Sequence, residues 1–207
     1  MKIRTSVVLL LIALFSLPTC MYGKGMRVRN GSFQSTKGRG LTNEDIASFR
    51  VKGLQCPDKN DWPDWWFFFG KGGKFRFPKT GGVYNDQYAT ISGSNAILRG
   101  YFGYPLETDF IYTVWVRGQG ELKVGCFSYA YEKGQARFLP PSEGGAKEQI
   151  VRVDSQEWVR YRFLIKKTTE LSSVHPALTA IEGVLDVDEV DITPASQGLK
   201  LLVGEEE

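Results

Sequence analysis

Apolar and polar residues alternate with a period of two through much of the chain after residue 65. The alternation is clearest in residues 111–118, 121–131 and 157–165, which are rich in Val, Ile, Tyr, Phe and Trp. Turn-forming residues separate these runs, as in GQG at 118–120. Side chains that alternate in this way are typical of strands with one face in a core. The pattern predicts several antiparallel strands joined by turns.

Three stretches depart from simple alternation. In residues 184–193, Leu185 and Val187 are out of phase with Val190 and Ile192, which predicts a β-bulge. Residues 168–180 are the only plausible helical turn after residue 65, and Pro176 limits it. Residues 45–51 fit either a strand or a short helix. We therefore expect an all-β fold, an antiparallel β-sandwich of the jelly roll type, in one domain.

The N-terminus has the pattern of an export signal. Lys2 and Arg4 precede an apolar run at residues 7–17, and small or polar residues follow it. We expect a signal peptide at residues 1–23, a domain at 24–196, a flexible tail at 197–207, and no transmembrane span after cleavage. Cys20 resembles the cysteine of a lipoprotein signal, although Thr19 departs from that motif. The mature protein would be secreted, periplasmic or surface-anchored.

The charge and the cysteine and histidine content make several classes of function less plausible. Without residues 1–23 the net charge falls from +3 to +1, so no strong field favours nucleic acid. Cys56 and Cys126 then remain, and they form either a disulfide or two separate buried thiols. His175 is the only histidine, which leaves little material for a catalytic triad or a histidine metal site. We expect a protein that is not an enzyme.

Five motifs occur in an order that resembles a known family. They are NGSFQ at 30–34, WPDWW at 62–66, the segment 105–131, EWVRYRFLI at 157–165 and LDVDEVDITP at 185–194. Together they resemble carbohydrate-binding modules of families 4 and 9, which have a galactose-binding-domain-like jelly roll. The resemblance covers about residues 28–194. It implies an exported module that binds a polysaccharide or glycan, alone or beside a separate enzyme or surface protein.

The resemblance also implies a structural calcium ion. In the family an opening glutamate and an aspartate of the closing strand help to hold this ion. Asp188 matches the aspartate, but Gln34 stands at the glutamate position. A neutral amide is a weaker ligand for a hard cation than a carboxylate is. The expected calcium site is therefore a weakened one.

The stretch NDWPDWWFFFG at 60–70 holds six aromatic residues within eight positions. A sugar ring presents a face of C–H groups that stacks on aromatic rings, and its hydroxyl groups need polar partners. By alternation Trp65, Phe67 and Phe69 share one face, and Trp66 and Phe68 share the other. One set belongs to the core, and the other is available for a ligand. The candidate carbohydrate contacts are Trp62, Trp66, Tyr84, Tyr101, Tyr104 and Tyr129. The alternative is a structural or adhesive surface protein of the same fold, with these rings buried and a protein as its partner.

Overall fold

The computed structural model describes residues 28–55, 57–70 and 72–196. The predicted signal peptide, Cys20, Cys56 and the tail at 197–207 lie outside the described residues. In the described part, no helix combines the length and the apolar character needed to cross a membrane.

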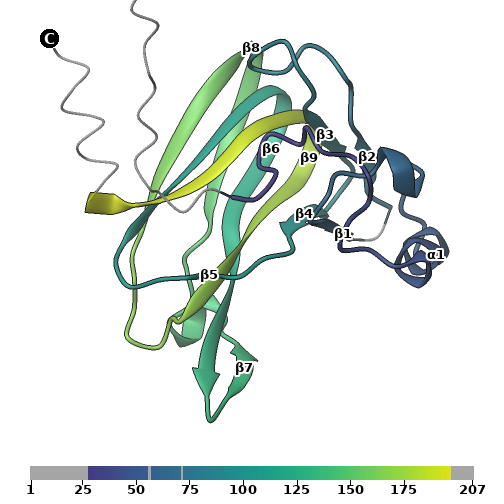
Figure 1. The fold of residues 1–207 in the computed structure, drawn as a ribbon. Helices are drawn as coiled ribbons and strands as arrows, with labels where there is room; N and C mark the ends of the chain where they lie inside the picture. The colour runs from purple at the N-terminus through teal and green to yellow at the C-terminus, as the bar shows by residue number, and fades with distance from the viewer. Residues whose placement is uncertain (1–27, 56, 71, 197–207) are drawn as a thin grey trace, which may run out of the picture.

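The described chain forms an all-β antiparallel β-sandwich of the jelly roll type, built from one curled sheet with a single α-helix beside it (Figure 1). Two short 3₁₀ turns lie at Lys59–Asp61 and Pro141–Glu143. The elements are α1 (Asn43–Val51), β1 (Trp66–Phe69), β2 (Lys74–Arg76), β3 (Ala89–Ser92), β4 (Ala96–Gly100), β5 (Tyr104–Pro105), β6 (Phe110–Glu132), β7 (Gln135–Phe138), β8 (Gln149–Ile165) and β9 (Ser173–Pro194).

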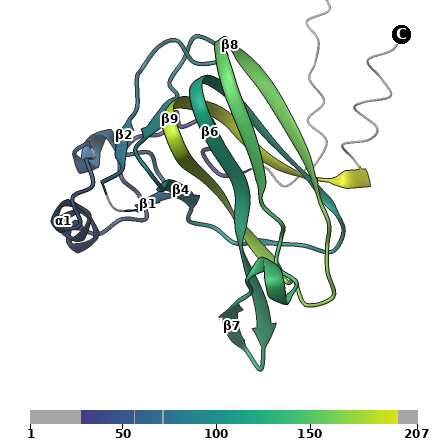
Figure 2. The same cartoon turned by 180° about the vertical axis from the view of Figure 1, so that it is seen from behind.

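The long strands β6 and β9 pair along almost their whole length and form the spine of the sheet. On the other side of β9, its first half pairs with β4 and its second half with β3, and β1 and β2 extend the sheet from these. The strand β8 pairs with the opposite side of β6. The β6–β7 hairpin extends beyond the sheet, away from α1, in both views (Figures 1 and 2).

Glycines allow the spine to keep its close pairing. Gly183 lies opposite Gly120 and has a φ of +84°. A Cβ atom on Gly183 would lie 2.0 Å from the carbonyl oxygen of Gln119, so any other residue would push the two strands apart.

One face of the sheet makes the core. Along β6 the even-numbered residues Tyr112, Val114, Val116, Leu122 and Val124 are completely buried. This confirms the alternation predicted for residues 111–118 and for the aliphatic face of 121–131.

The predicted bulge is confirmed. The pairing of β6 with β9 passes from Thr113–Asp191 to Trp115–Asp188, so β9 has one extra residue there. Glu189, inside this bulge, has a φ of 47°. The helical turn considered for 168–180 is wrong, because Ser173 begins β9, which pairs with both β4 and β6. Residues 45–51 belong to α1, which a capping box between Thr42 and Asp45 starts.

Candidate functional site

The side of the sheet that faces away from the core carries a dense group of rings where β1, β4, β9 and β6 lie side by side. We call this surface the aromatic face. Its residues are half-buried or exposed, because each points away from the buried side of its strand or lies in an adjoining loop. They are Trp65, Phe67, Phe69, Arg99, Tyr101, Phe102, Phe127, Tyr129, Phe138 and His175.

The rings of the aromatic face form a continuous row. Neighbouring centroids lie 5.1 to 6.4 Å apart along the series Tyr101, Phe67, Phe69, Phe127, Phe138. Phe69 on β1 and Phe127 on β6 are 6.3 Å apart, although β4 and β9 lie between their strands. In a flat sheet those strands would be about 14 Å apart, so the two rings approach each other across the face.

Arg99 of β4 lies within this row. Its guanidinium carbon is 4.9 Å from the Phe127 centroid and 5.8 Å from those of Phe69 and Tyr129. Its Nη2 donates to the Tyr129 hydroxyl at 3.2 Å. The Nε atom is buried and has no hydrogen-bond partner among the described residues. His175 packs against the Tyr129 ring, and burial together with the positive charge of Arg99 lowers the pKa of its imidazole.

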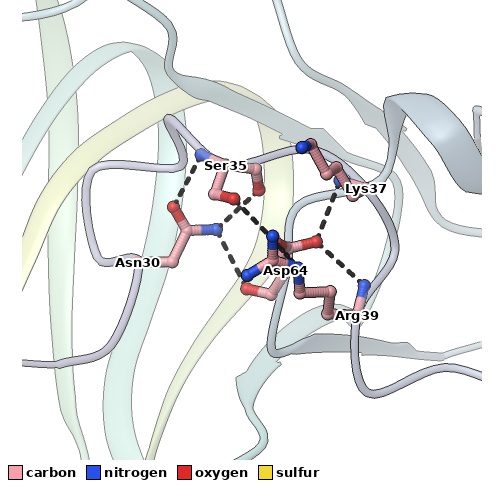
Figure 3. Close-up of polar contacts among 5 residues, drawn as sticks. All are labelled: Asn30, Ser35, Lys37, Arg39 and Asp64. Atoms are coloured by element: carbon pink, nitrogen blue, oxygen red, sulfur yellow. Dashed lines mark hydrogen bonds and ion pairs between the residues drawn. The ribbon is translucent and has the colours of Figure 1, made fainter.

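The loop that carries Trp65 is held in place by a buried carboxylate (Figure 3). Asp64 accepts hydrogen bonds from the Ser35 hydroxyl at 2.6 Å and from the backbone N–H groups of Lys37 and Arg39 at 2.9 and 2.8 Å. Burial alone would raise the pKa of Asp64, but these hydrogen bonds outweigh it and lower the pKa. Asn30 adds side-chain bonds to the backbone of Ser35 and Asp64. Trp65 follows with a φ of 68°, which turns its ring toward the aromatic face.

Two of the predicted carbohydrate contacts are in the core. Trp62 and Trp66 have no exposed surface, so their predicted exposure is wrong. Their indole N–H groups find acceptors inside the protein: Trp62 Nε1 donates to the carbonyl of Trp66 at 3.0 Å, and Trp66 Nε1 donates to the carbonyl of Asn30 at 2.9 Å. A tryptophan with a satisfied N–H group can be buried at little polar cost.

The four predicted tyrosines all reach the surface, in two places. Tyr101, 43% exposed, and Tyr129 belong to the aromatic face. Tyr84, 71% exposed, and Tyr104 line an adjoining hollow of about 770 Å³ beside the N-terminal segment, which Phe102 of the aromatic face also lines. Ligand contact by any of the four stays a prediction.

Sequence reasoning missed most of the aromatic face. The alternation correctly places Trp65, Phe67 and Phe69 on one side, but the predicted ligand contact Trp66 lies on the other side, which is the core. Alternation along residues 121–131 sets Phe127 on the side opposite Leu122 and Val124, and this is a usable signal. Arg99 and Phe138 gave no signal in the sequence alone, because only the folded sheet brings them beside the other rings.

A second group of rings surrounds Arg117 on β6. Its guanidinium carbon lies 4.5 Å from the Trp158 centroid and 4.9 Å from the Tyr88 centroid. Here a carboxylate is present: Arg117 Nε pairs with Asp186 at 2.9 Å, and Thr90 donates to the same carboxylate at 2.7 Å. This stacked arginine is neutralised within the protein.

The residues expected at a calcium site can be tested against the structure. Asp188 is fully buried and accepts from the N–H groups of Val83 and Glu189. Burial raises the pKa of Asp188 to about 7. A Cβ on Gly82 would lie 2.8 Å from Asp188 Oδ2 and 2.6 Å from Asp86 Oδ1, and the latter atom is buried without a hydrogen-bond partner.

A pair of carboxylates beside a glycine fits a hard cation. In the described part of the chain, no group of three or more His, Cys, Asp or Glu side chains is arranged to hold a metal ion. Further ligands would have to be carbonyl, amide or water oxygens. The exposed side chain of Gln34 donates to the carbonyl groups of Ser32 and Gln87, both at 2.8 Å.

Cys126 carries a free thiol, and burial raises its pKa. The described residues therefore give no support to the candidate disulfide. Cys56 itself lies outside them.

Comparison with solved structures places the fold among known proteins. No known family model matches the chain, and no curated protein matches it. A protein from Bacteroides thetaiotaomicron, described as a candidate sugar-binding protein, is 12% identical with a TM-score of 0.51, over 82% of this chain and 99% of that one. At this identity the similarity supports the jelly roll fold alone.

Two further solved structures are carbohydrate-binding modules. One includes a family 22 carbohydrate-binding module of a Clostridium thermocellum xylanase, in complex with xylohexaose. It is 15% identical over 64% of this chain and 26% of that longer chain, with a TM-score of 0.46. The other is a xylan-binding domain from Paenibacillus barcinonensis, 14% identical over 62% and 84% of the two chains, with a TM-score of 0.45. Neither is described as a family 4 or 9 module, so that finer assignment stays a prediction.

Proposed function

We propose that this protein binds a polysaccharide or glycan at the aromatic face and does not cleave it. The observation that carries the proposal is the row of partly exposed rings on a rigid sheet, with Arg99 among them. Aromatic rings offer flat apolar surface to the C–H face of a sugar, and the guanidinium and tyrosine hydroxyl groups offer polar partners to its hydroxyl groups. A site of this kind is largely preformed, which limits the entropy lost on binding.

The proposed cellular setting follows from the export signal predicted at residues 1–23. An exported module would meet glycans outside the cytoplasm, either alone or beside a separate enzyme or surface protein. The fold shared with the Bacteroides protein, described as a candidate sugar-binding protein, is compatible with this role.

Binding to a protein partner, as a structural or adhesive surface protein, is the second candidate. The β6–β7 hairpin favours it, because it extends beyond the sheet with Tyr131 at 59% and Phe138 at 50% exposure (Figures 1 and 2). Large exposed apolar side chains on a projecting element are common at protein interfaces.

A structural calcium ion is a further part of the proposal. Asp188 and Asp86 would hold it, and Gln34 would contribute at most a neutral oxygen. The ion would neutralise two neighbouring carboxylates and tie the loop at Gly82 to the closing strand.

Affinity electrophoresis on a panel of polysaccharides tests the main proposal. Tyr101→Ala, on the aromatic face, should lower the affinity for the retained polysaccharide. Tyr84→Ala, in the adjoining hollow, is the matched control and should leave it unchanged. The reverse result would move the site to the hollow beside the N-terminal segment. No retention on any polysaccharide would favour the protein-binding alternative.

A further inference from the structure

Arg99 has an unusual environment for a charged side chain. Three rings surround its guanidinium group, and one of its N–H groups bonds to the Tyr129 hydroxyl. The Nε donor is buried without an acceptor in the described part of the structure. No carboxylate of a described residue lies within ion-pair distance of it. A buried donor without an acceptor is costly, and arginine has five N–H groups and cannot lose its charge.

The aromatic face supplies no negative charge of its own. Among the residues that define it, none is Asp or Glu. Arg29, which stacks on Trp65 and Phe102 at 4.9 and 5.0 Å, adds a second positive charge at its edge. At the margin of the face, Lys123 pairs with Glu148 at 3.1 Å, and Arg137 pairs with Glu143 at 2.7 Å. These two carboxylates are thus already engaged with other cations.

Arg117 provides an internal comparison. It is stacked on two rings in a similar way, but Asp186 neutralises it at 2.9 Å. Among the stacked arginines of the fold, Arg117 therefore has a carboxylate beside it, whereas Arg99 has none among the described residues. This difference points to an acceptor that comes from outside the chain.

We infer that the ligand of the aromatic face carries an anionic substituent on its sugar ring, a carboxylate or a sulfate, and that Arg99 pairs with it. This inference rests on the proposed function and names its substrate class, an acidic polysaccharide. A planar guanidinium group matches a carboxylate or sulfate through two parallel N–H bonds. The neighbouring rings would stack on the sugar and exclude water, which strengthens the ion pair.

The test compares polymers that differ only in charge. Polygalacturonate and the same polymer after reduction of its carboxyl groups are compared by affinity electrophoresis and calorimetry, with dextran sulfate and dextran as the sulfate pair. The unchanged protein should bind the anionic member of at least one pair roughly tenfold to a hundredfold more tightly than its neutral counterpart. Preference for the carboxylate or for the sulfate pair identifies the anion.

Variants then assign the preference to one side chain. Arg99→Gln should abolish the preference for the anionic polymer. Arg99→Lys should keep only part of this preference, because a lysine offers a point charge instead of two parallel N–H donors. Arg76→Gln is the matched control, since Arg76 is an exposed arginine on β2 outside the aromatic face. Equal binding of anionic and neutral polymers by the unchanged protein would overturn the inference and leave the proposed function intact. A folded Arg99→Gln variant that still prefers the anionic polymer would also overturn the inference and leave the proposed function intact. Absence of binding to every polymer, charged or neutral, would overturn both.

Discussion

The guanidinium group of Arg99 lies 4.9 Å from the centre of the Phe127 ring, although β9 separates their strands. The contact therefore crosses the outer surface of the sheet. Because each strand is paired along this region, backbone hydrogen bonds fix the main-chain positions that carry the two groups. The spacing of Arg99, Phe127 and the rings on β1 is therefore set by the sheet.

Removing one ring of this surface should weaken glycan binding without unfolding the protein. Phe127→Ala deletes a half-buried ring from the outer face, and we expect a loss of roughly threefold to tenfold in affinity. Calorimetry with the best polysaccharide fragment measures this change. Val184→Ala is the control, because Val184 is an exposed apolar residue of β9 beyond the aromatic face, at 57% exposure. Equal affinities for the two variants would speak against the face as the binding site.

Trp66 should matter for stability and not for binding. Trp66→Ala removes a completely buried indole and should destabilise the fold by about 3–5 kcal/mol. Trp66→Phe keeps most of the volume but leaves the carbonyl of Asn30 without its donor, at a cost of roughly 1–3 kcal/mol. Denaturant unfolding measures both losses. A folded Trp66→Phe protein with normal stability and reduced glycan affinity would show that Trp66 contacts the ligand after all.

Asp64 should make the protein sensitive to acid. Its pKa is lower in the folded state than in the unfolded chain, so its stabilising effect is complete above about pH 4. That contribution is lost as the pH falls through the pKa of the folded state. Asp64→Asn should therefore lower the free energy of unfolding at neutral pH and flatten its decline below about pH 4. Urea unfolding at a series of pH values checks both effects. If the free energy of unfolding depended on pH in the same way for the unchanged protein and for Asp64→Asn, this role of Asp64 would be excluded.

Calcium should stabilise the protein through Asp188 and Asp86. An ion that binds only the folded state raises the melting temperature, and above its dissociation constant the stabilisation grows with the logarithm of its concentration. Melting in calcium and in a chelator, with magnesium for comparison, measures the effect. Asp188→Asn should remove it while keeping an oxygen that can accept from Val83. Identical melting curves for the unchanged protein in calcium and chelator would exclude the site.

The strands and the bulge at Glu189 could be read from the sequence, because alternation and its change of phase are local signals. The sequence could not predict which of Trp65 and Trp66 is buried, because both faces of that stretch are aromatic. In the structure, the buried indole of Trp66 donates to the carbonyl of Asn30, which lies 36 positions away in the chain.

The role inferred for Arg99 was also beyond the reach of the sequence. It depends on which rings surround the guanidinium group and on the absence of a nearby carboxylate among the described residues. Both follow from the arrangement of four strands. The comparison with Arg117 shows that two arginines in similar strand patterns can differ in this respect.

The most direct test of the central claim is to map the ligand onto the surface by nuclear magnetic resonance. Labelled protein would be titrated with oligosaccharides from whichever polysaccharide it binds. The account predicts that the largest chemical-shift changes fall on Phe67, Arg99, Tyr101, Phe127 and Tyr129, with little change at Tyr84 or Val184. Changes centred on the hollow at Tyr84 and Tyr104, or on the exposed hairpin at Tyr131, would contradict it.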